Sequence, residues 1–446
     1  MQSESLFLKM QVDKTTLNDL SIFNSDEHQS IFHFLNHTQT NEGRNYLYQL
    51  LSKPLATIDA IEDTQTTIQQ LQTKINNWPK KITNGTIMVL EKFYETPFSN
   101  FSARPSFLDA ALFKVLNSVD YSLIKYSVTH FIHFVKGMQQ IQLLLQQLKS
   151  KQIDLWSNKI ELLLKHVIVE EMLAESNDAE ISSVKILRYT HFIKHHFKQS
   201  FEALLEVYSK LDAYCSLAIA CTKNNFSFPT FVATQQPLFD AENMHHPLLE
   251  NPVSYTVQLN NESNFLFLTG ANMAGKSTFI KTIGIGVYLA HLGIGVPAKK
   301  MQLSLFDGLL SNIHVMDNIL KGESYFFNEV QRIKNTVERI SNGKNWLILI
   351  DELFKGTNVQ DAMKCSTTVI EGLHKMNNAL FVLSTHLYEI ADDLKQFNNI
   401  QFKYFETSIV DDQLLFSYHL KEGISNDRLG YLILKKEGVV DLLKKL

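Results

Sequence analysis

The stretch TGANMAGKST, residues 269–278, has the spacing G-x-x-x-x-G-K-[ST], in which two glycines precede a lysine and a serine. A loop of this kind joins a strand to a helix, and its backbone N–H groups converge on phosphate at the positive end of the helix dipole. The apolar run FLFLT, residues 265–269, precedes it, and an apolar helical pattern follows. The pattern therefore predicts a strand, a phosphate-binding loop and a helix.

The loop residues have separate expected roles. Gly270 and Gly275 allow the tight turn. Lys276 would reach the β- and γ-phosphates of a nucleotide, and the Ser277 hydroxyl would bind Mg²⁺. Since only 17 of 446 residues are glycine, a chance match is disfavoured. We expect nucleotide contacts from Gly270, Ala271, Asn272, Met273, Ala274, Gly275, Lys276, Ser277 and Thr278.

Two further segments place reactive side chains after buried strands. In WLILIDEL, residues 346–353, Asp351 can hold Mg²⁺ opposite the loop serine, and Glu352 can orient or deprotonate the attacking water. In LSTHL, residues 383–387, His386 follows another apolar strand. Physical reasoning alone leaves His386 open as either a catalytic group or a structural hydrogen bonder.

The composition is that of a globular protein, and we expect the N-terminal residues not to act as a signal peptide. Hydrophobic residues make up 45% and charged residues 20%, and the net charge of −4 means that any nucleic-acid surface must be a local basic patch. Three cysteines without a C-x-x-C pair fit a reducing cytosol, so we expect a cytoplasmic protein. The longest apolar run, residues 283–296, is shorter than the roughly 20 residues that span a membrane.

The helical pattern changes near residue 226. Earlier residues show helical stripes, and we expect helical blocks over 138–156, 160–175 and about 183–221. Four of the nine prolines then fall within 226–252, and apolar strands alternate with helices beyond them. We therefore predict a tail over 1–20, a helical core or lever domain over 21–225, a linker with the start of the next domain over 226–252, and a P-loop ATPase domain over 253–446.

The strand pattern also predicts the sheet type. Runs that are apolar on both faces and separated by helices are typical of a mostly parallel sheet covered on both sides. The fold class we expect is α + α/β, with long helices followed by a P-loop NTPase domain.

At these residues the chain resembles the MutS family, the mismatch-repair ATPases related to the ABC class. In the C-terminal half the resemblance rests, besides the loop, on HHPLLE (245–250), VMDNILKGESYFFNEV (315–330), LILIDELFKGT (347–357) and STHLYEI (384–390). In the N-terminal half, residues 31–71 are similar to the family's helical core, and LNHTQTNEG matches its L-N-x-T-x-T-x-x-G run.

The resemblance implies a composite ATP site in a homodimer. Each ATP, with Mg²⁺ held by Ser277 and Asp351, would be completed by the partner's signature serine, here Ser324 with Gly322. Asn272 and His386 stand at positions that the family uses for the nucleotide and for catalysis. The catalytic residues that we expect are Glu352, His386 and Lys276.

The chain also departs from the family pattern. The core-like stretch begins near residue 20, so we expect no N-terminal mismatch-binding domain, and the F-x-E strings at 93–95 and 327–329 are attributed to chance. The DNA clamp is expected to be short or missing, and no C-terminal helix-turn-helix is expected. Ala271 and Ala274 replace a proline and a glycine of the family loop, outside the minimal phosphate-binding pattern.

A basic stretch, VKILRYTHFIKHHFKQSF at 184–201, is the candidate DNA contact. It can be a lever surface that touches phosphates, but a solvated helix face is the favoured interpretation. The leading functional hypothesis is an ATPase whose cycle is coupled to mismatched or branched DNA in repair or recombination, with a possible repair-protein partner. The alternative is a nucleotide-switched protein-interaction module that does not itself hold DNA.

Overall fold

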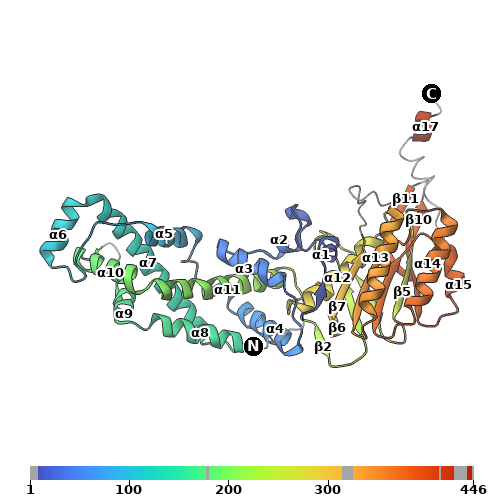
Figure 1. Ribbon diagram of the computed structural model, residues 1–446, viewed down its shortest axis with the longest axis horizontal. Helices are drawn as coiled ribbons and strands as arrows, with labels where there is room; N and C mark the ends of the chain where they lie inside the picture. Colours follow the sequence, from blue (N-terminus) through green and yellow to red (C-terminus); the bar gives the residue numbers. More distant parts are fainter. Residues whose placement is uncertain (1–8, 177–179, 314–324, 411–412, 426–438, 444–446) are drawn as a thin grey trace. The chain divides into compact units, whose positions relative to one another are not determined.

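The computed structural model describes residues 9–176, 180–313, 325–410, 413–425 and 439–443 (Figure 1). Its contacts divide the chain into two compact units. The sheet unit contains residues 1–34, 53–62 and 224–446, and the helical unit contains residues 35–52 and 63–223. The observed fold is thus mixed α and α/β, as the sequence predicts.

The helical unit is built from amphipathic helices around an aromatic core. In that core the Phe201 ring lies 6.2 Å from Phe131 and 5.2 Å from Phe134. The helices are α3 (Asn41–Leu51), most of α4 (Ile58–Gln72), α5 (Asn84–Glu95), α6 (Phe107–Leu116), α7 (Ser118–Leu145), α8 (Lys151–Leu164), α9 (Val167–Ala174), α10 (Ser183–His196) and α11 (Lys198–Lys223).

Three expected helical blocks are interrupted in the structure. The block 138–156 contains the end of α7 and the start of α8, where the Ser150 hydroxyl accepts a hydrogen bond from the backbone N–H of Ile153. The block 160–175 is divided by His166, which caps α9 through its ring. The block 183–221 breaks at Phe197 between α10 and α11. The apolar spacing in the sequence continues across these positions, but local capping ends one helix and begins the next.

The turn before α3 explains why the N-terminal stretch that resembles the family's helical core carries Thr40 and Gly43. The Asp212 carboxylate, on α11, accepts hydrogen bonds from the backbone N–H groups of Gln39 and Thr40, both at 2.9 Å, and from the Thr40 hydroxyl at 2.6 Å. The Thr40 hydroxyl in turn accepts from the backbone N–H of Gly43 at 3.1 Å. A Cβ on Gly43 would lie 2.2 Å from a carboxylate oxygen of Asp212, so only glycine fits this position without rearrangement.

The sheet unit holds a seven-stranded sheet in the order β1-β7-β8-β9-β5-β10-β11. All neighbouring pairs are parallel except β10 with β11, which confirms the prediction of a mostly parallel sheet. The strands are β1 (Gln11–Val12), β5 (Phe265–Thr269), β7 (Gly308–Asn312), β8 (Trp346–Asp351), β9 (Ala379–Ser384), β10 (Ile400–Val410) and β11 (Gln413–Glu422).

Helices cover both faces of the three central strands. On one face, Ile348 and Ile350 pack in a cluster with α14 (Val359–Leu373). On the other face, Leu349 lies against α12 (Lys276–His291) at Gly284, where a Cβ would be 2.6 Å from the leucine side chain. Burial on both faces is why β5, β8 and β9 are continuous apolar runs.

A smaller four-stranded sheet has the order β2-β6-β3-β4. The proline-rich stretch 226–252, expected to be a linker and the start of the next domain, carries two of these strands. They are β2 (Thr230–Val232) and β3 (Phe239–Met244), joined by β4 (Tyr255–Leu259) and β6 (Lys300–Ser304).

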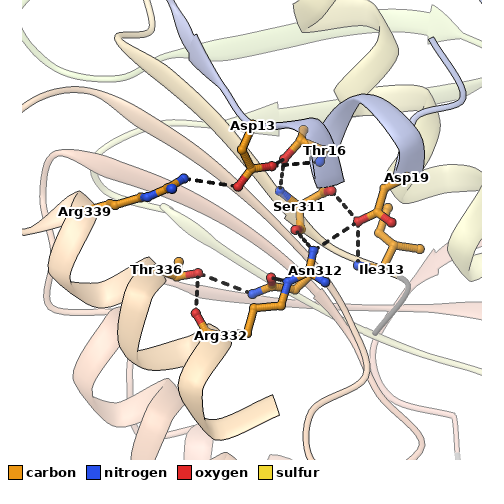
Figure 2. A network of polar contacts seen from close by, with 9 residues as sticks. All are labelled: Asp13, Thr16, Asp19, Ser311, Asn312, Ile313, Arg332, Thr336 and Arg339. Carbon is orange, nitrogen blue, oxygen red and sulfur yellow. Dashed lines mark hydrogen bonds and ion pairs between the residues drawn. The ribbon is translucent and has the colours of Figure 1, made fainter. Parts of the chain in front are cut away.

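The N-terminal segment differs from the expected tail. Within residues 1–20, β1 pairs with β7, and α1 (Lys14–Asp19) packs on the sheet unit. Figure 2 shows the polar network that holds it, in which the Asp19 carboxylate accepts from the Ser311 hydroxyl at 2.5 Å and from the Ile313 N–H at 3.0 Å. Arg332, on α13 (Tyr325–Ile340), lies 3.5 Å from the same carboxylate. Residues 9–34 are therefore part of the sheet unit and not of the helical domain expected from residue 21.

Within the described ranges, none of the helices combines the length and apolarity needed to cross a membrane.

Candidate nucleotide site

The strand order brings the predicted site residues to one edge of the large sheet. Strands β8, β9 and β5 are adjacent and parallel, so their carboxyl ends lie side by side. The loop 270–275 follows β5, Asp351 ends β8, and His386 follows β9. In open parallel sheets, this edge is where ligands bind.

Glycine is required at two positions of the loop. Gly270 and Gly275 have φ angles of 139° and 103°, in the region that side chains with a Cβ rarely adopt. A Cβ on Gly270 would also lie 3.3 Å from the backbone of Phe405 on β10. Gly275 leads directly into α12. The positive end of the dipole of this 16-residue helix therefore lies at the loop.

The Lys276 side chain is folded back into the loop. Its ammonium donates hydrogen bonds to the carbonyl oxygens of Gly270 at 2.7 Å and Ala271 at 2.8 Å, and lies 3.5 Å from Nε2 of His386. Burial lowers the pKa of this ammonium to about 8, against the opposing influence of the Glu352 and Asp351 carboxylates. A buried cation thus lies directly beneath the loop.

Asp351 is held between two serine hydroxyls. One carboxylate oxygen accepts from Ser277 in the first turn of α12, and the other accepts from Ser384 at the end of β9. Ser384 was not predicted, although it stands in the STHL segment, because its partner Asp351 is opposite it only through the β8–β9 register. Hydroxyl and carboxylate oxygens are the ligands that Mg²⁺ prefers.

Glu352 lies next to a histidine and a lysine. Its carboxylate is 2.6 Å from Nε2 of His386 and 2.9 Å from the ammonium of Lys355. Burial would raise the pKa of Glu352, but the hydrogen bonds and charges of these two partners outweigh it and lower the pKa to about 2. The Glu352 backbone is also in the left-handed region, with φ of 65°. Lys355 was not predicted as a site residue. The only indication of its role in the sequence is that it follows Glu352 by three residues.

A cavity of about 500 Å³ opens over the loop. Of the predicted residues, it is lined by Ala271, Asn272, Met273, Gly275, Lys276, Ser277, Thr278 and Glu352. The other residues that line the cavity were not predicted as site residues. They are Leu249, Glu250, Asn251, Val253, Tyr255 and Tyr418. Gly270, Ala274, Asp351 and His386 are not among the residues that line it. The volume is within the range of about 300–1,000 Å³ that small-molecule sites occupy.

The structure does not describe the predicted signature residues. Ser324, like Gly322, falls outside the described residues, so its role in completing an ATP site stays a prediction.

The basic stretch of α10 has internal partners. Lys185 pairs with Glu175 at 2.6 Å, and Arg188 pairs with Glu171. Lys194 donates to backbone carbonyl oxygens of residues 94 and 96, at 3.2 and 2.7 Å. These contacts favour the helix-face interpretation of the stretch over a phosphate-binding surface. The described residues also contain no group of three or more His, Cys, Asp or Glu side chains arranged to hold a metal ion.

Both halves of the chain resemble domains of known proteins. Family models of MutS domain III and MutS domain V match residues 15–218 and 266–442. The chain is 32% identical over 257 residues to the DNA mismatch repair protein MSH3 of Vanderwaltozyma polyspora, covering 54% of this chain and 24% of that protein.

Two bacterial proteins give similar matches. Identity to the DNA mismatch repair protein MutS of Petrotoga mobilis is 27%, covering 60% of this chain and 33% of the relative, and identity to MutS of Bacillus subtilis is 28%, covering 60% and 31%. The chain thus spans about a third or less of the length of the curated relatives it matches. Both halves of the sequence match domains of one family, and the chain belongs to the MutS family.

Proposed function

We propose that this chain is a MutS-type ATPase, with a P-loop NTPase fold in the sheet unit, which binds ATP and Mg²⁺ in the cavity over the β5–α12 loop and couples hydrolysis to DNA binding. One observation carries the proposal. A buried lysine, a serine–aspartate pair and a glutamate–histidine pair converge on one cavity at a helix N-terminus. This combination matches what phosphoryl transfer needs, because catalysis there is mainly positioning and charge stabilisation.

The residues present fit both ligands. The helix N-terminus and the Lys276 ammonium suit the phosphates of ATP, and Ser277 with Asp351 offers hard oxygen ligands for Mg²⁺. When bound, Mg²⁺ would neutralise charge on the phosphate oxygens. Ser384 keeps the Asp351 carboxylate oriented toward Ser277.

The roles of Glu352 and His386 follow from their pairing. A carboxylate with a pKa of about 2 accepts a proton poorly at neutral pH, so Glu352 acts by orienting water and by fixing the ring of His386. This refines the sequence-based hypothesis, which left orientation and deprotonation open for Glu352.

The parts of the proposal that concern the dimer and DNA rest on what the family resemblance implies. Ser324 would complete the site of a second copy, so that closure of two sheet units depends on ATP, and the helical units would transmit that closure to mismatched or branched DNA. The relatives are named as DNA mismatch repair proteins, which supports a role in repair.

A second candidate is a nucleotide-switched protein-interaction module. The internal pairing of Lys185, Arg188 and Lys194 favours it, because these cations are already used inside the helical unit. In that case ATP would control the docking of a repair partner, and DNA would not be held directly.

Gel-shift titrations with homoduplex, mismatched and branched DNA, each with and without ATP and Mg²⁺, test the DNA part. We expect ATP-dependent binding to at least one of the non-homoduplex DNAs. If none of the three DNAs binds while ATP is still hydrolysed, the DNA part is wrong. Retention of a specific protein partner after nuclease digestion of the extract would then support the interaction module.

A further inference from the structure

Helix α6 presents a broad apolar face to solvent. Each of six large side chains on α6 and in the first turn of α7 is between 59% and 81% exposed. They form what we term the α6 face: Phe107, Leu108, Leu112, Val115, Leu116 and Val119.

The opposite side of α6 is already buried. Ala110 and Phe113 are 1% and 6% exposed, and the Phe113 ring lies edge-on to Phe101 at 5.3 Å. At 100° per residue, the exposed apolar residues of α6 span about half of the helix circumference. An apolar helix face is normally buried against another element. In one copy of this chain, the wide apolar face of α6 is exposed.

The area of the face suits a protein contact. Burying one such side chain removes about 100 Å² of apolar surface from water, so six that are mostly exposed present on the order of 500 Å². Leu123 and Tyr126 on α7 are also 43% and 54% exposed, and a stable interface buries roughly 800 Å² of each partner. A cavity of about 320 Å³ beside Leu112 and Leu116 can receive a side chain from the partner.

The charges at the two borders indicate which partner fits. Asp109 and Lys114 lie on opposite borders of the α6 face. A twofold axis parallel to α6 would bring Asp109 of one copy to the border that carries Lys114 of the other, as flanking charges do in parallel helix pairs. An antiparallel pairing would place like charges on the same border. Nucleic acid would need cations across the face, whose six members are all apolar.

We propose that the α6 face is a self-association surface, on which a second copy of this chain packs its own α6 in parallel orientation. This contact lies in the helical unit and needs no nucleotide. It is separate from the ATP-dependent pairing of sheet units proposed above.

Analytical ultracentrifugation of the full chain without nucleotide tests the contact. We expect a dimer at micromolar concentration, and Leu112→Glu should raise its dissociation constant by at least about 30-fold, as loss of a central apolar contact does. The matched control is Leu155→Glu on α8, where the leucine is 69% exposed outside the face, and it should change nothing. A monomeric wild type, or equal dissociation constants for all three proteins, would overturn the proposal. The Lys276→Ala variant should still dimerise. A failure of the proposed ATP site can therefore be distinguished from a failure of the α6 contact.

Cysteine cross-linking tests the orientation. In a Cys365→Ser background, where the remaining Cys215 and Cys221 are buried, Leu108→Cys should form disulfide-linked dimers under mild oxidation. Parallel packing places Leu108 beside its own copy, whereas antiparallel packing places it beside Val115. Disulfide formation only in a mixture of Leu108→Cys and Val115→Cys chains would contradict the parallel arrangement.

Discussion

The turn at residues 35–44 and the loop at residues 269–278 both carry dense sequence patterns, but their polar groups have different partners. In the turn, Asp212 satisfies the backbone and hydroxyl groups of Thr40 from within the protein. In the loop, Lys276 and Ser277 also bond within the protein, to loop carbonyl oxygens and to Asp351, but both line an open cavity. Two equally well-patterned stretches of sequence therefore have different roles. The turn is a structural joint, meaning a site that holds two parts of the helical unit together, and the loop is a candidate ligand site. Substitutions should cost stability in the turn, and binding or turnover in the loop.

The largest expected effect is on turnover in the sheet unit. Glu352→Gln removes the charge that fixes His386 and orients water, so steady-state ATP hydrolysis should fall by at least about 10²-fold, while ATP affinity stays within a few-fold. Glu338→Gln is the control, because Glu338 is an exposed partner of Lys334 on α13. Equal turnover in Glu352→Gln and wild type would remove Glu352 from the mechanism.

The next effect is on the stability of the helical unit. Asp212→Ala leaves the N–H groups of Gln39 and Thr40 without their acceptor, and should lower the free energy of unfolding by about 3 kcal/mol. Urea denaturation measures this loss. Glu202→Ala, an exposed residue on the same helix paired with Lys198, should change it by less than about 0.5 kcal/mol. Unchanged stability in Asp212→Ala would mean that the turn is not a structural joint.

A smaller effect is expected from pH on nucleotide binding. Because the pKa of Lys276 in the free protein is about 8, ATP binds best below pH 8, and its affinity should fall as pH rises through that value, by up to about tenfold per unit. Isothermal titration calorimetry from pH 7 to 9.5 measures the fall. Glu352→Gln should move it to lower pH, since the Glu352 carboxylate raises the pKa of Lys276. An affinity independent of pH over this range would show that the charge on Lys276 does not contribute.

The loop and its neighbouring acids could be predicted because each lies next to a strongly patterned strand. The sequence located Lys276, Ser277, Asp351 and Glu352, and the structure brings them together at one sheet edge. Ser384 could not be assigned, since its contact with Asp351 depends on the register of strands 33 residues apart.

The N-terminal segment escaped prediction for a related physical reason. Strand β1 is two residues long, too short for an alternating pattern, and its partner Gly308 is far along the chain. Asp19 likewise gave no signal, because its partners, among them Ser311 and Ile313, lie far along the chain (Figure 2). Short elements that are fixed by distant partners have no local signature.

The most direct test of the contrast between joint and ligand site is Lys276→Ala, measured for both melting temperature and ATP affinity. Burial disfavours the charged ammonium in the folded protein, so its removal should leave the melting temperature unchanged or slightly higher. ATP affinity should fall by at least about 100-fold, because charge-assisted bonds to phosphate are lost. A variant that melts several degrees lower yet binds ATP like the wild type would contradict the account.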